Sequence, residues 1–329
     1  MQYLYYPGCS LEGTAKEYDQ ATRALLQRLE VRLTEVEDWT CCGASAAPGI
    51  SRLLALALAG RNLAMAERAK IKADLLVPCS ACYLNLKKTA ETLRADPQAM
   101  RDTNEVLAEE ELSISGKIRV RHLLDVLATD LGPSAIAGKV AFPLKDLVVA
   151  PYYGCQCLRP YPIFDDPQKP TSMEGLIRAT GAEVLSWSMG PRCCGASHMT
   201  THMDQGMQLS GAILAAARDA DVIATVCPMC QLNLEGFQKQ ISRRTGQGEA
   251  ITVLYLPQLL GIALGIPPKE LGLTLNLAVT EAFKKRIAMN EDLPVLAVQR
   301  PETGRQPPCE SLDDDEPISQ RRTMGAHSH

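Results

Sequence analysis

Cys79-Ser80-Ala81-Cys82-Tyr83-Leu84-Asn85-Leu86 is the stretch that decides the fold, because it returns as Cys227-Pro228-Met229-Cys230-Gln231-Leu232-Asn233-Leu234. Two shorter blocks return with it. Cys41-Cys42-Gly43-Ala44-Ser45 matches Cys193-Cys194-Gly195-Ala196-Ser197, and Tyr6-Pro7-Gly8-Cys9 matches Tyr153-Gly154-Cys155 with one gap. The three displacements are 148, 152 and 146 residues in that order. A nearly constant displacement over separate blocks indicates an internal duplication.

Ten of the twelve cysteines fall in these blocks, in two sets of five. The first cysteine set is Cys9, Cys41, Cys42, Cys79 and Cys82, and the second cysteine set is Cys155, Cys193, Cys194, Cys227 and Cys230. Thiolates are the standard ligands of iron–sulfur clusters, and C-x-x-C at the start of a helix places two of them on one turn, where the helix dipole favours the thiolate form. The glycine after each adjacent pair lets the backbone pass close to an inorganic core or adopt a positive φ. The sequence therefore predicts an iron–sulfur site in each half.

Zinc is the alternative ligand for these thiols. Structural zinc takes four ligands in a tetrahedron, usually from two closely spaced pairs. The fifth cysteine of each set and the gaps of 31 to 37 residues between the motifs fit zinc less well. Zinc in one of the two halves stays open as an alternative.

Short apolar runs alternate with stretches of helical periodicity in both halves. Strands are expected at residues 3–6, 31–37, 74–77, 146–150, 183–187 and 221–224, and a last short strand and helix at 122–131 and 255–264. Helices are expected at residues 14–29 and 172–180, after each cysteine pair and after each C-x-x-C. This alternation predicts an α/β fold of two tandem, pseudo-symmetric, Rossmann-like domains with mostly parallel strands. The cysteines are then expected at the C-terminal ends of strands, where open α/β sheets place their sites.

The domain boundaries follow from the same pattern. We expect a first domain at residues 1–135 and a second at 145–268, with the boundary near residues 132–138. Residues 269–329 form a C-terminal extension, which from about residue 300 has almost no apolar periodicity and is expected to be largely disordered. Cys309 lies in this tail, where we interpret it as an incidental thiol.

Composition excludes several classes of protein. The net charge is −4 and only 5% of the residues are aromatic, so neither electrostatics nor base stacking favours nucleic-acid binding. The N-terminus lacks the basic start and apolar run of a signal peptide, and no apolar stretch approaches the length that spans a bilayer. These features predict a cytoplasmic protein without a transmembrane segment, in whose reducing surroundings cysteines serve as ligands rather than disulfides.

The two motifs, C-x31-C-C-G-x35-C-x-x-C and C-x37-C-C-G-x31-C-x-x-C, resemble the cysteine-rich CCG domain. Two such domains in tandem, over about residues 1–265, resemble the B subunit of heterodisulfide reductases. The second motif has a spacing four residues shorter after its Cys-Cys-Gly, but it keeps all five cysteines.

The resemblance implies that each cysteine set binds a noncubane [4Fe-4S] cluster. It implies an oxidoreductase acting on sulfur groups, in which a disulfide or a protein-bound thiol substrate is reduced, or in reverse formed, between the two clusters, each giving an electron and accepting a sulfur. It also implies two partners from the same complex, one ferredoxin-like and the other flavin-containing. The chain itself shows no flavin or nucleotide fingerprint.

Three residues of the second half have candidate roles beyond the repeat. His198 and His202 follow the cysteine pair at a spacing of four, and since histidine titrates near neutral pH they are candidate proton donors or exposed residues at the start of a helix. Cys157 would share the face of Cys155 on a strand, as an alternative iron ligand, a redox-active thiol or a packed neighbour.

A second hypothesis belongs to another functional class. It is a non-catalytic electron-transfer or structural CCG subunit of a flavoprotein dehydrogenase, with zinc in one half as a variant. The complete ten-cysteine set favours the catalytic role over this alternative.

Overall fold

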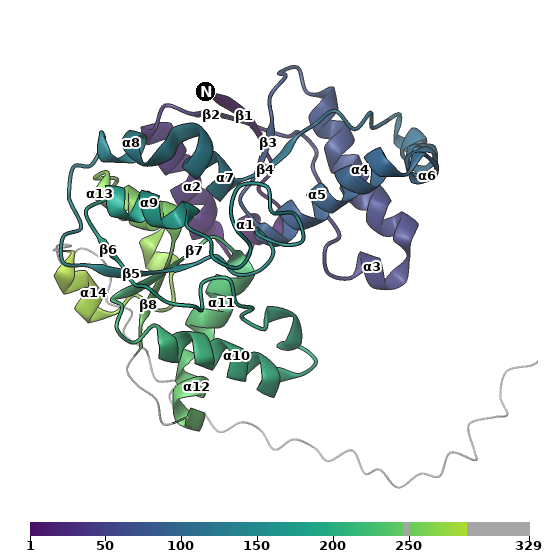
Figure 1. Ribbon diagram of the computed structural model, residues 1–329. Coiled ribbons are helices and arrows are strands. Elements are labelled where there is room, and N and C mark those ends of the chain that lie inside the picture. The colour runs from purple at the N-terminus through teal and green to yellow at the C-terminus, as the bar shows by residue number, and fades with distance from the viewer. Residues whose placement is uncertain (246–249, 288–329) are drawn as a thin grey trace, which may run out of the picture. The chain divides into compact units, whose positions relative to one another are not determined.

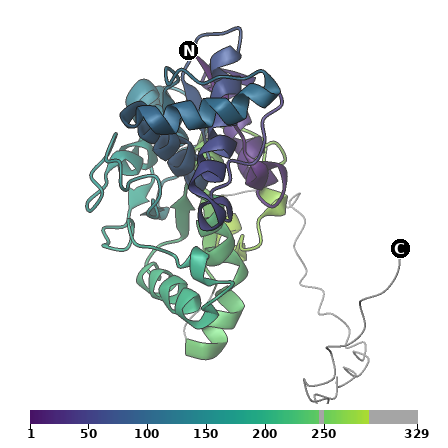
Figure 2. The same cartoon turned by 90° about the vertical axis from the view of Figure 1, so that its right-hand side faces the viewer.

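The computed structural model describes residues 1–245 and 250–287 (Figures 1 and 2). The expected disorder from about residue 300 and Cys309 lie outside these residues. The described part belongs to one compact unit, which contains both copies of the repeat. In both views the green helices α10 (Met203–Ala216) and α12 (Gln238–Thr245) lie at the end away from the N-terminus.

The first half is built on a four-stranded parallel sheet. Its strands are β1 (Gln2–Tyr5), β2 (Arg32–Glu35), β3 (Leu75–Val77) and β4 (Val120–His122), in the order β2-β1-β3-β4. The central strands carry buried apolar residues, whereas β2 at the edge is largely exposed. Continuous apolar runs are typical of parallel strands covered on both faces.

The second half repeats this sheet. Its strands are β5 (Val148–Tyr152), β6 (Glu183–Val184), β7 (Val222–Thr225) and β8 (Thr252–Tyr255), in the order β6-β5-β7-β8 with every pair parallel. The identical strand order confirms the predicted pair of tandem α/β domains. The edge strands differ in length, since β6 has two residues where β2 has four.

Helices connect the strands in both halves. The first half contains α1 (Cys9–Glu12), α2 (Lys16–Arg28), α3 (Ala47–Ile50), α4 (Arg52–Arg68), α5 (Ser80–Ala95), α6 (Pro97–Leu107), α7 (Leu123–Asp125) and α8 (Gly132–Ala137). The second contains α9 (Ser172–Ala179), α10 (Met203–Ala216), α11 (Pro228–Gly236), α12 (Gln238–Thr245), α13 (Leu256–Ala263) and α14 (Glu281–Arg286). Short 3-10 turns lie at Ala108–Glu110, Ala196–His198 and Leu273–Leu275, and a π-helical turn at Val126–Leu131.

One hydrophobic core cluster contains residues of both halves, and a smaller one lies within the second half. Helix α2 of the first half packs against α13 of the second, and the two lie beside each other in Figure 1. At this contact the rings of Tyr18 and Tyr255 stack with centroids 4.0 Å apart and an interplanar angle of 3°. The segment 132–138, expected as a boundary, forms α8, which packs against α9. Residues after Lys269 also contribute, because Leu271, Leu273 and Phe283 are buried.

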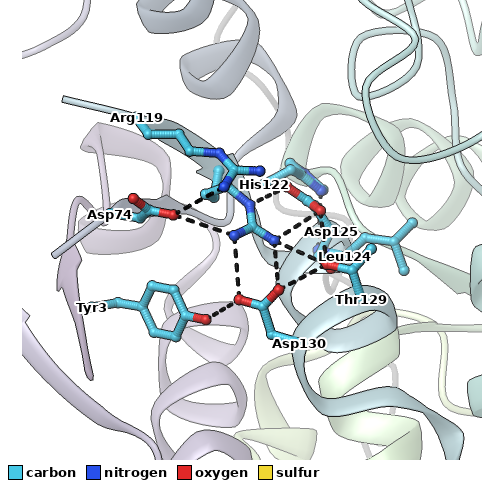
Figure 3. A network of polar contacts seen from close by, with 9 residues as sticks. Tyr3, Asp74, Arg119, His122, Leu124, Asp125, Thr129 and Asp130 are labelled. Carbon is cyan, nitrogen blue, oxygen red and sulfur yellow. Dashed lines mark hydrogen bonds and ion pairs between the residues drawn. The ribbon is translucent and has the colours of Figure 1, made fainter. Parts of the chain in front are cut away.

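A buried arginine on the edge strand β4 forms a network of ion pairs at one side of the first sheet (Figure 3). Arg121 on β4 is 4% exposed and contacts the carboxylates of Asp74, Asp125 and Asp130. The Tyr3 hydroxyl on β1 donates to Asp130 as well. A buried cation needs such pairing, because an unpaired charge inside a protein is costly. The network joins β1, β3 and β4 to the π-helical turn.

Candidate functional site

The first cysteine set gathers where the strands of the first sheet end. Cys9 opens α1 just after β1, Cys41 and Cys42 lie in the loop after β2, and Cys79 precedes α5 directly after β3. Carboxyl ends of parallel strands meet at one edge of a sheet, so segments far apart in sequence meet there. The Sγ atoms of Cys9 and Cys41 are 4.0 Å apart.

The second cysteine set repeats the arrangement at the end of the second sheet. Cys155 follows β5, the Cys193–Cys194 pair lies in the loop after β6, and Cys227 caps α11 after β7. The Sγ atoms of Cys194 and Cys230 are 3.5 Å apart. The structure thus brings together all five cysteines of each set.

Three cysteines of each set are buried, and the other two are exposed or half-buried. Cys42, Cys79 and Cys82 are buried, as are Cys194, Cys227 and Cys230 in the second set. Cys9, Cys41 and Cys193 are exposed, and Cys155 is half-buried. A group held by either set would therefore be anchored in the core and reachable from outside.

Two glycines allow the backbone to pass directly over sulfur. A Cβ added at Gly8 would lie 2.8 Å from Sγ of Cys82, and one added at Gly154 would lie 3.0 Å from Sγ of Cys230. Both residues have positive φ, 76° and 69°. Glycine alone provides this approach and this backbone conformation without strain. The positive φ foreseen for Gly43 and Gly195 is present too, at 78° and 77°.

Two hydrogen bonds, one from a tyrosine and one from an asparagine, hold each cysteine pair in place. The Tyr6 hydroxyl donates to the carbonyl oxygen of Thr40 at 2.6 Å, just as Tyr152 donates to Arg192 at 2.7 Å. Tyr6 therefore corresponds to Tyr152, so the repeat needs no gap, contrary to the alignment with Tyr153.

The second hydrogen bond to each cysteine pair comes from an asparagine in the helix that begins at each C-x-x-C. Asn85 Nδ2 donates to the carbonyl oxygen of Cys42 at 2.6 Å, and Asn233 Nδ2 donates to that of Cys194 at 3.2 Å. Sequence reasoning assigned no role to these asparagines. Their equal place in both copies, three residues after the last cysteine, was the available signal.

Hydrogen bonds between thiols make some cysteines more acidic than their neighbours. The bond with Cys82 lowers the pKa of Cys42 to about 7, against the effect of burial. In the second set a bond with Cys155 lowers the pKa of Cys193 to about 5, and the nearby charges of His198 and Arg159 act in the same direction. A bond with Cys230 lowers the pKa of Cys227 to about 7. These thiols can deprotonate near neutral pH, as metal ligands must.

Each set has five thiols, one more than a tetrahedral ion binds. In residues 1–245 and 250–287 no group of three His, Cys, Asp or Glu side chains is arranged to hold one metal ion. Soft thiols around a common opening are donors of the kind that iron–sulfur cores and zinc both accept.

Cys157 lies away from the opening. It follows the end of β5 rather than continuing the strand, so the expected alternation with Cys155 does not apply. Its Sγ is buried and donates to the carbonyl oxygen of Tyr153 at 3.2 Å. Burial raises its pKa. These contacts favour the interpretation of Cys157 as a packed neighbour.

The two histidines lie on the surface beside the second set. His198 ends a 3-10 turn and His202 immediately precedes α10, with ring centroids 6.1 Å apart. Both are exposed and border a recess of about 470 Å³ together with Gln205, Gln208 and Leu209. They lie close enough to Cys193 for the charge of His198 to affect its pKa.

The ligand loops of the two halves contact each other directly. The Ser80 hydroxyl, next to Cys79, donates to the carbonyl oxygen of Val226, next to Cys227, at 3.0 Å. His122 Nε2 lies 3.1 Å from the same hydroxyl, and its Nδ1 accepts from the backbone N–H of Leu124. Burial lowers the pKa of His122 to about 4, so this ring is neutral at pH 7.

Fold and site together define a class of protein: two fused α/β domains, each with five thiols at the ends of its strands. The sequence pattern of one cysteine-rich domain family, CCG, matches residues 3–87 and 149–235. The chain belongs to this family and carries its domain twice.

Several curated relatives match this chain over most of its length. The chain is 36% identical to the 8-methylmenaquinol:fumarate reductase membrane anchor subunit of Wolinella succinogenes, covering 84% of this chain and 96% of that protein. It is 32% identical to the B subunit of the ferredoxin/F(420)H(2)-dependent CoB-CoM heterodisulfide reductase of Methanosarcina acetivorans, covering 86% and 95%. An Archaeoglobus profundus protein, named as similar to the heterodisulfide reductase B subunit, is 26% identical, covering 88% and 99%. The resemblance to the B subunit of heterodisulfide reductase is thereby confirmed.

A solved structure shares the fold. A hypothetical protein from Helicobacter pylori superimposes with a TM-score of 0.67 at 16% identity, over 85% of this chain and 52% of that one. The chain thus spans about half of that protein, and the likeness concerns the fold alone. No helix within the described residues is long and apolar enough to cross a membrane.

Proposed function

We propose that this chain is the catalytic iron–sulfur subunit of a heterodisulfide reductase-like complex in the cytoplasm. The observation that carries the proposal is the duplicated site: five converging thiols, a glycine over the inner sulfur and the same tyrosine and asparagine supports in each half. The match to the CCG family and to heterodisulfide reductase relatives supports it.

Each cysteine set would hold one noncubane [4Fe-4S] cluster. The three buried cysteines of each set would anchor it, and the exposed ones would close it on the solvent side. Such clusters supply electrons one at a time. Two of them in one chain suit the two-electron cleavage or formation of a disulfide or related sulfur substrate.

The chain's own residues would serve the substrate thiols in defined ways. His198 and His202 are exposed beside Cys193, so they are placed to give protons to thiolates released there. His122 is unsuited to this task, because it is fully buried and its Nδ1 already accepts a backbone hydrogen bond. Electrons would arrive from the ferredoxin-like and flavin-containing partners of the complex.

Metal analysis of the anaerobically purified chain tests the proposal. We expect about eight irons and no stoichiometric zinc per chain, with electron paramagnetic resonance signals distinct from those of cubane clusters. Cys42→Ser and Cys194→Ser should each remove about half of the iron, whereas Cys157→Ala should remove none. Zinc in place of iron in both halves would refute the proposal, and about four irons with one zinc would leave a cluster in one half only.

A second candidate function has its own support. The relative in Wolinella succinogenes is named as part of a menaquinol:fumarate reductase, and at 36% identity it resembles this chain at least as well as the heterodisulfide reductase relatives do. In that setting the chain would transfer electrons or brace a flavoprotein without acting on sulfur. Reduced, iron-loaded chain that is reoxidised by a quinone analogue but by no disulfide would favour this second function.

A further inference from the structure

A recess of about 770 Å³ opens beside the second cysteine set. It begins where the short strand β6 ends, leaving the last part of β5 without a neighbour on that side. Pro151 lies in this part of β5, where a missing N–H costs no ladder bond. Trp187 fills part of the space, and its Nε1 donates to the carbonyl oxygen of Pro151 at 3.1 Å.

The walls of the recess are held by local hydrogen bonds. Asp165 accepts from the backbone N–H groups of Thr171 and Ser172, and Asp166 accepts from those of Gln168 and Lys169. On the opposite wall the carbonyl oxygen of Gly190 accepts from the N–H groups of Tyr153 and Gly154. The recess is therefore a formed feature of the fold.

Three cations line the recess: Arg159, Lys169 and Arg192. None of them forms an ion pair with any carboxylate within the described residues. Arg159 uses one N–H to reach the carbonyl oxygen of Pro191 at 2.6 Å, which leaves other donors of its five. Glu174 is the one acidic residue among those that line the recess, and it pairs with Arg178 at 3.1 Å. Asp165 and Asp166 in the wall are also acidic, but they accept backbone N–H groups, so the three cations stay without an ion-pair partner in the part of the chain that the structure describes.

A recess in the first half has an acidic lining, in which Glu35 and Asp38 pair with Arg23 and Arg61 from outside the lining. This recess of about 660 Å³ lies beside Cys9 and Cys41 and is lined by Glu12, Glu35, Glu37 and Asp38 and by no basic residue among those described. The position before the cysteine pair is Thr40 there and Arg192 here. The positive charge is therefore specific to the second half and does not follow from the shared fold.

We propose that the second-half recess binds a small molecule through an oxyanion group, such as a phosphate, sulfonate or carboxylate. Arg159, Lys169 and Arg192 hold the anion, because guanidinium and ammonium groups form charge-assisted hydrogen bonds with oxyanions. The indole of Trp187 and the prolines of the lining contact the rest of the molecule. Arg192 precedes Cys193, so the bound molecule lies next to the second cysteine set. The lining belongs to the chain alone, and binding does not depend on the proposed function.

The two tryptophans of the chain provide a test with an internal control. Trp187 lines the basic recess and Trp39 lines the acidic one. In the purified full-length Trp39→Phe variant, the fluorescence of Trp187 should change saturably with inorganic phosphate, but not with chloride at the same ionic strength. In Trp187→Phe, the fluorescence of Trp39 should show no saturable response to phosphate.

Charge variants in the Trp39→Phe background identify the site. Lys169→Gln with Arg192→Gln should raise the Kd for phosphate about tenfold or more, because two of the three charged donors of the recess are lost. Arg218→Gln, an exposed cation outside the recess, should leave the Kd unchanged. Three outcomes would overturn the inference. They are an equal Kd for phosphate in the double variant, no phosphate binding in the Trp39→Phe parent, and an equal fluorescence response to chloride. Iron content measured on the same samples reports separately on the proposed function.

Discussion

The Tyr18 hydroxyl lies 3.2 Å from the carbonyl oxygen of Val226, across the contact between the two halves of the chain. The same hydroxyl lies 3.1 Å from the carbonyl oxygen of Pro78. These carbonyls immediately precede Cys79 and Cys227. One buried side chain thus supports the backbone just before a buried cysteine of each set.

Tyr18→Phe should reduce the stability of the whole unit. The change leaves the buried carbonyl oxygen of Pro78 without this donor, whereas that of Val226 keeps the Ser80 hydroxyl. The loss of such a donor costs about 1–3 kcal/mol. Urea denaturation monitored by circular dichroism should show a lower midpoint with an unchanged slope. Tyr161→Phe, whose side chain is only partly buried, serves as the control and should match the parent. Equal midpoints for both variants would show that the hydroxyl contributes nothing.

Asn85→Ala and Asn233→Ala should each loosen one cysteine pair only. Each asparagine donates to the carbonyl oxygen of the second cysteine of its pair, so its loss weakens the hold on the Cys-Cys-Gly loop. The effect should be larger for Asn85, because Ser210 also donates to the Cys194 carbonyl, at 2.8 Å. Hydrogen-bonded supports of metal ligands affect metal affinity about 10- to 100-fold. Chelator-driven iron loss should therefore become faster for about half of the iron in each variant. Gln98→Ala, on the exposed side of α6, should lose iron at the parental rate.

Gly8→Ala and Gly154→Ala should prevent cluster assembly in the first and second half, respectively. The added methyl group would meet the sulfur of Cys82 or Cys230, and alanine is strained at the positive φ of both positions. Iron content should fall by about half in each. Gly49→Ala is the matched control, because nothing lies within 4 Å of a Cβ at that position and no positive φ is needed there. Full iron in Gly8→Ala would contradict the close approach of backbone to sulfur.

Glu235 should make stability depend on pH. Burial raises the pKa of this carboxyl to about 7, in spite of hydrogen bonds from Asn276 and neighbouring backbone. Because the folded pKa exceeds the unfolded one, the folded state binds the extra proton. Its stabilising effect is complete below about pH 4.5 and is lost as the pH rises through about 7.

Glu235→Gln removes this titration. Between pH 5 and 8 the parent should lose up to about 3 kcal/mol of unfolding free energy relative to the variant. Parallel urea titrations across that range measure the difference. If the unfolding free energies of the parent and of Glu235→Gln differ by the same amount at every pH in that range, the carboxyl does not titrate near 7.

Most strands could be predicted from local pattern, because each central strand is a short buried apolar run. Helix α6 was missed, although Asp96 accepts from the N–H groups of Gln98 and Ala99 and Pro97 follows it, a recognisable helix start. The convergence of cysteines followed from the repeat and the rule that sites lie at strand ends. The ligand assignment itself, His198 and His202 as proton donors, and the domain limits remain predictions.

The joint core could not be predicted from the sequence. Tyr18 and Tyr255 both occur in apolar segments, but nothing local indicates that they stack on each other. The basic recess was equally hidden, because Arg159 and Lys169 lie at separate places in the long loop between β5 and α9, and Arg192 lies in another loop, after β6. Long-range contact is decided by packing, which a periodic pattern does not encode.

The packing of α2 on α13 has a consequence for how such a chain can evolve. Each copy of the repeat covers apolar surface of the other, so neither can be deleted, exchanged or moved to another gene without exposing that surface to water. Mutations that specialise one copy, such as the exchange of acidic for basic residues around its opening, can accumulate only while the partner copy is retained. The duplication is therefore permanent, and the distance between its two cysteine sets is inherited as a single trait.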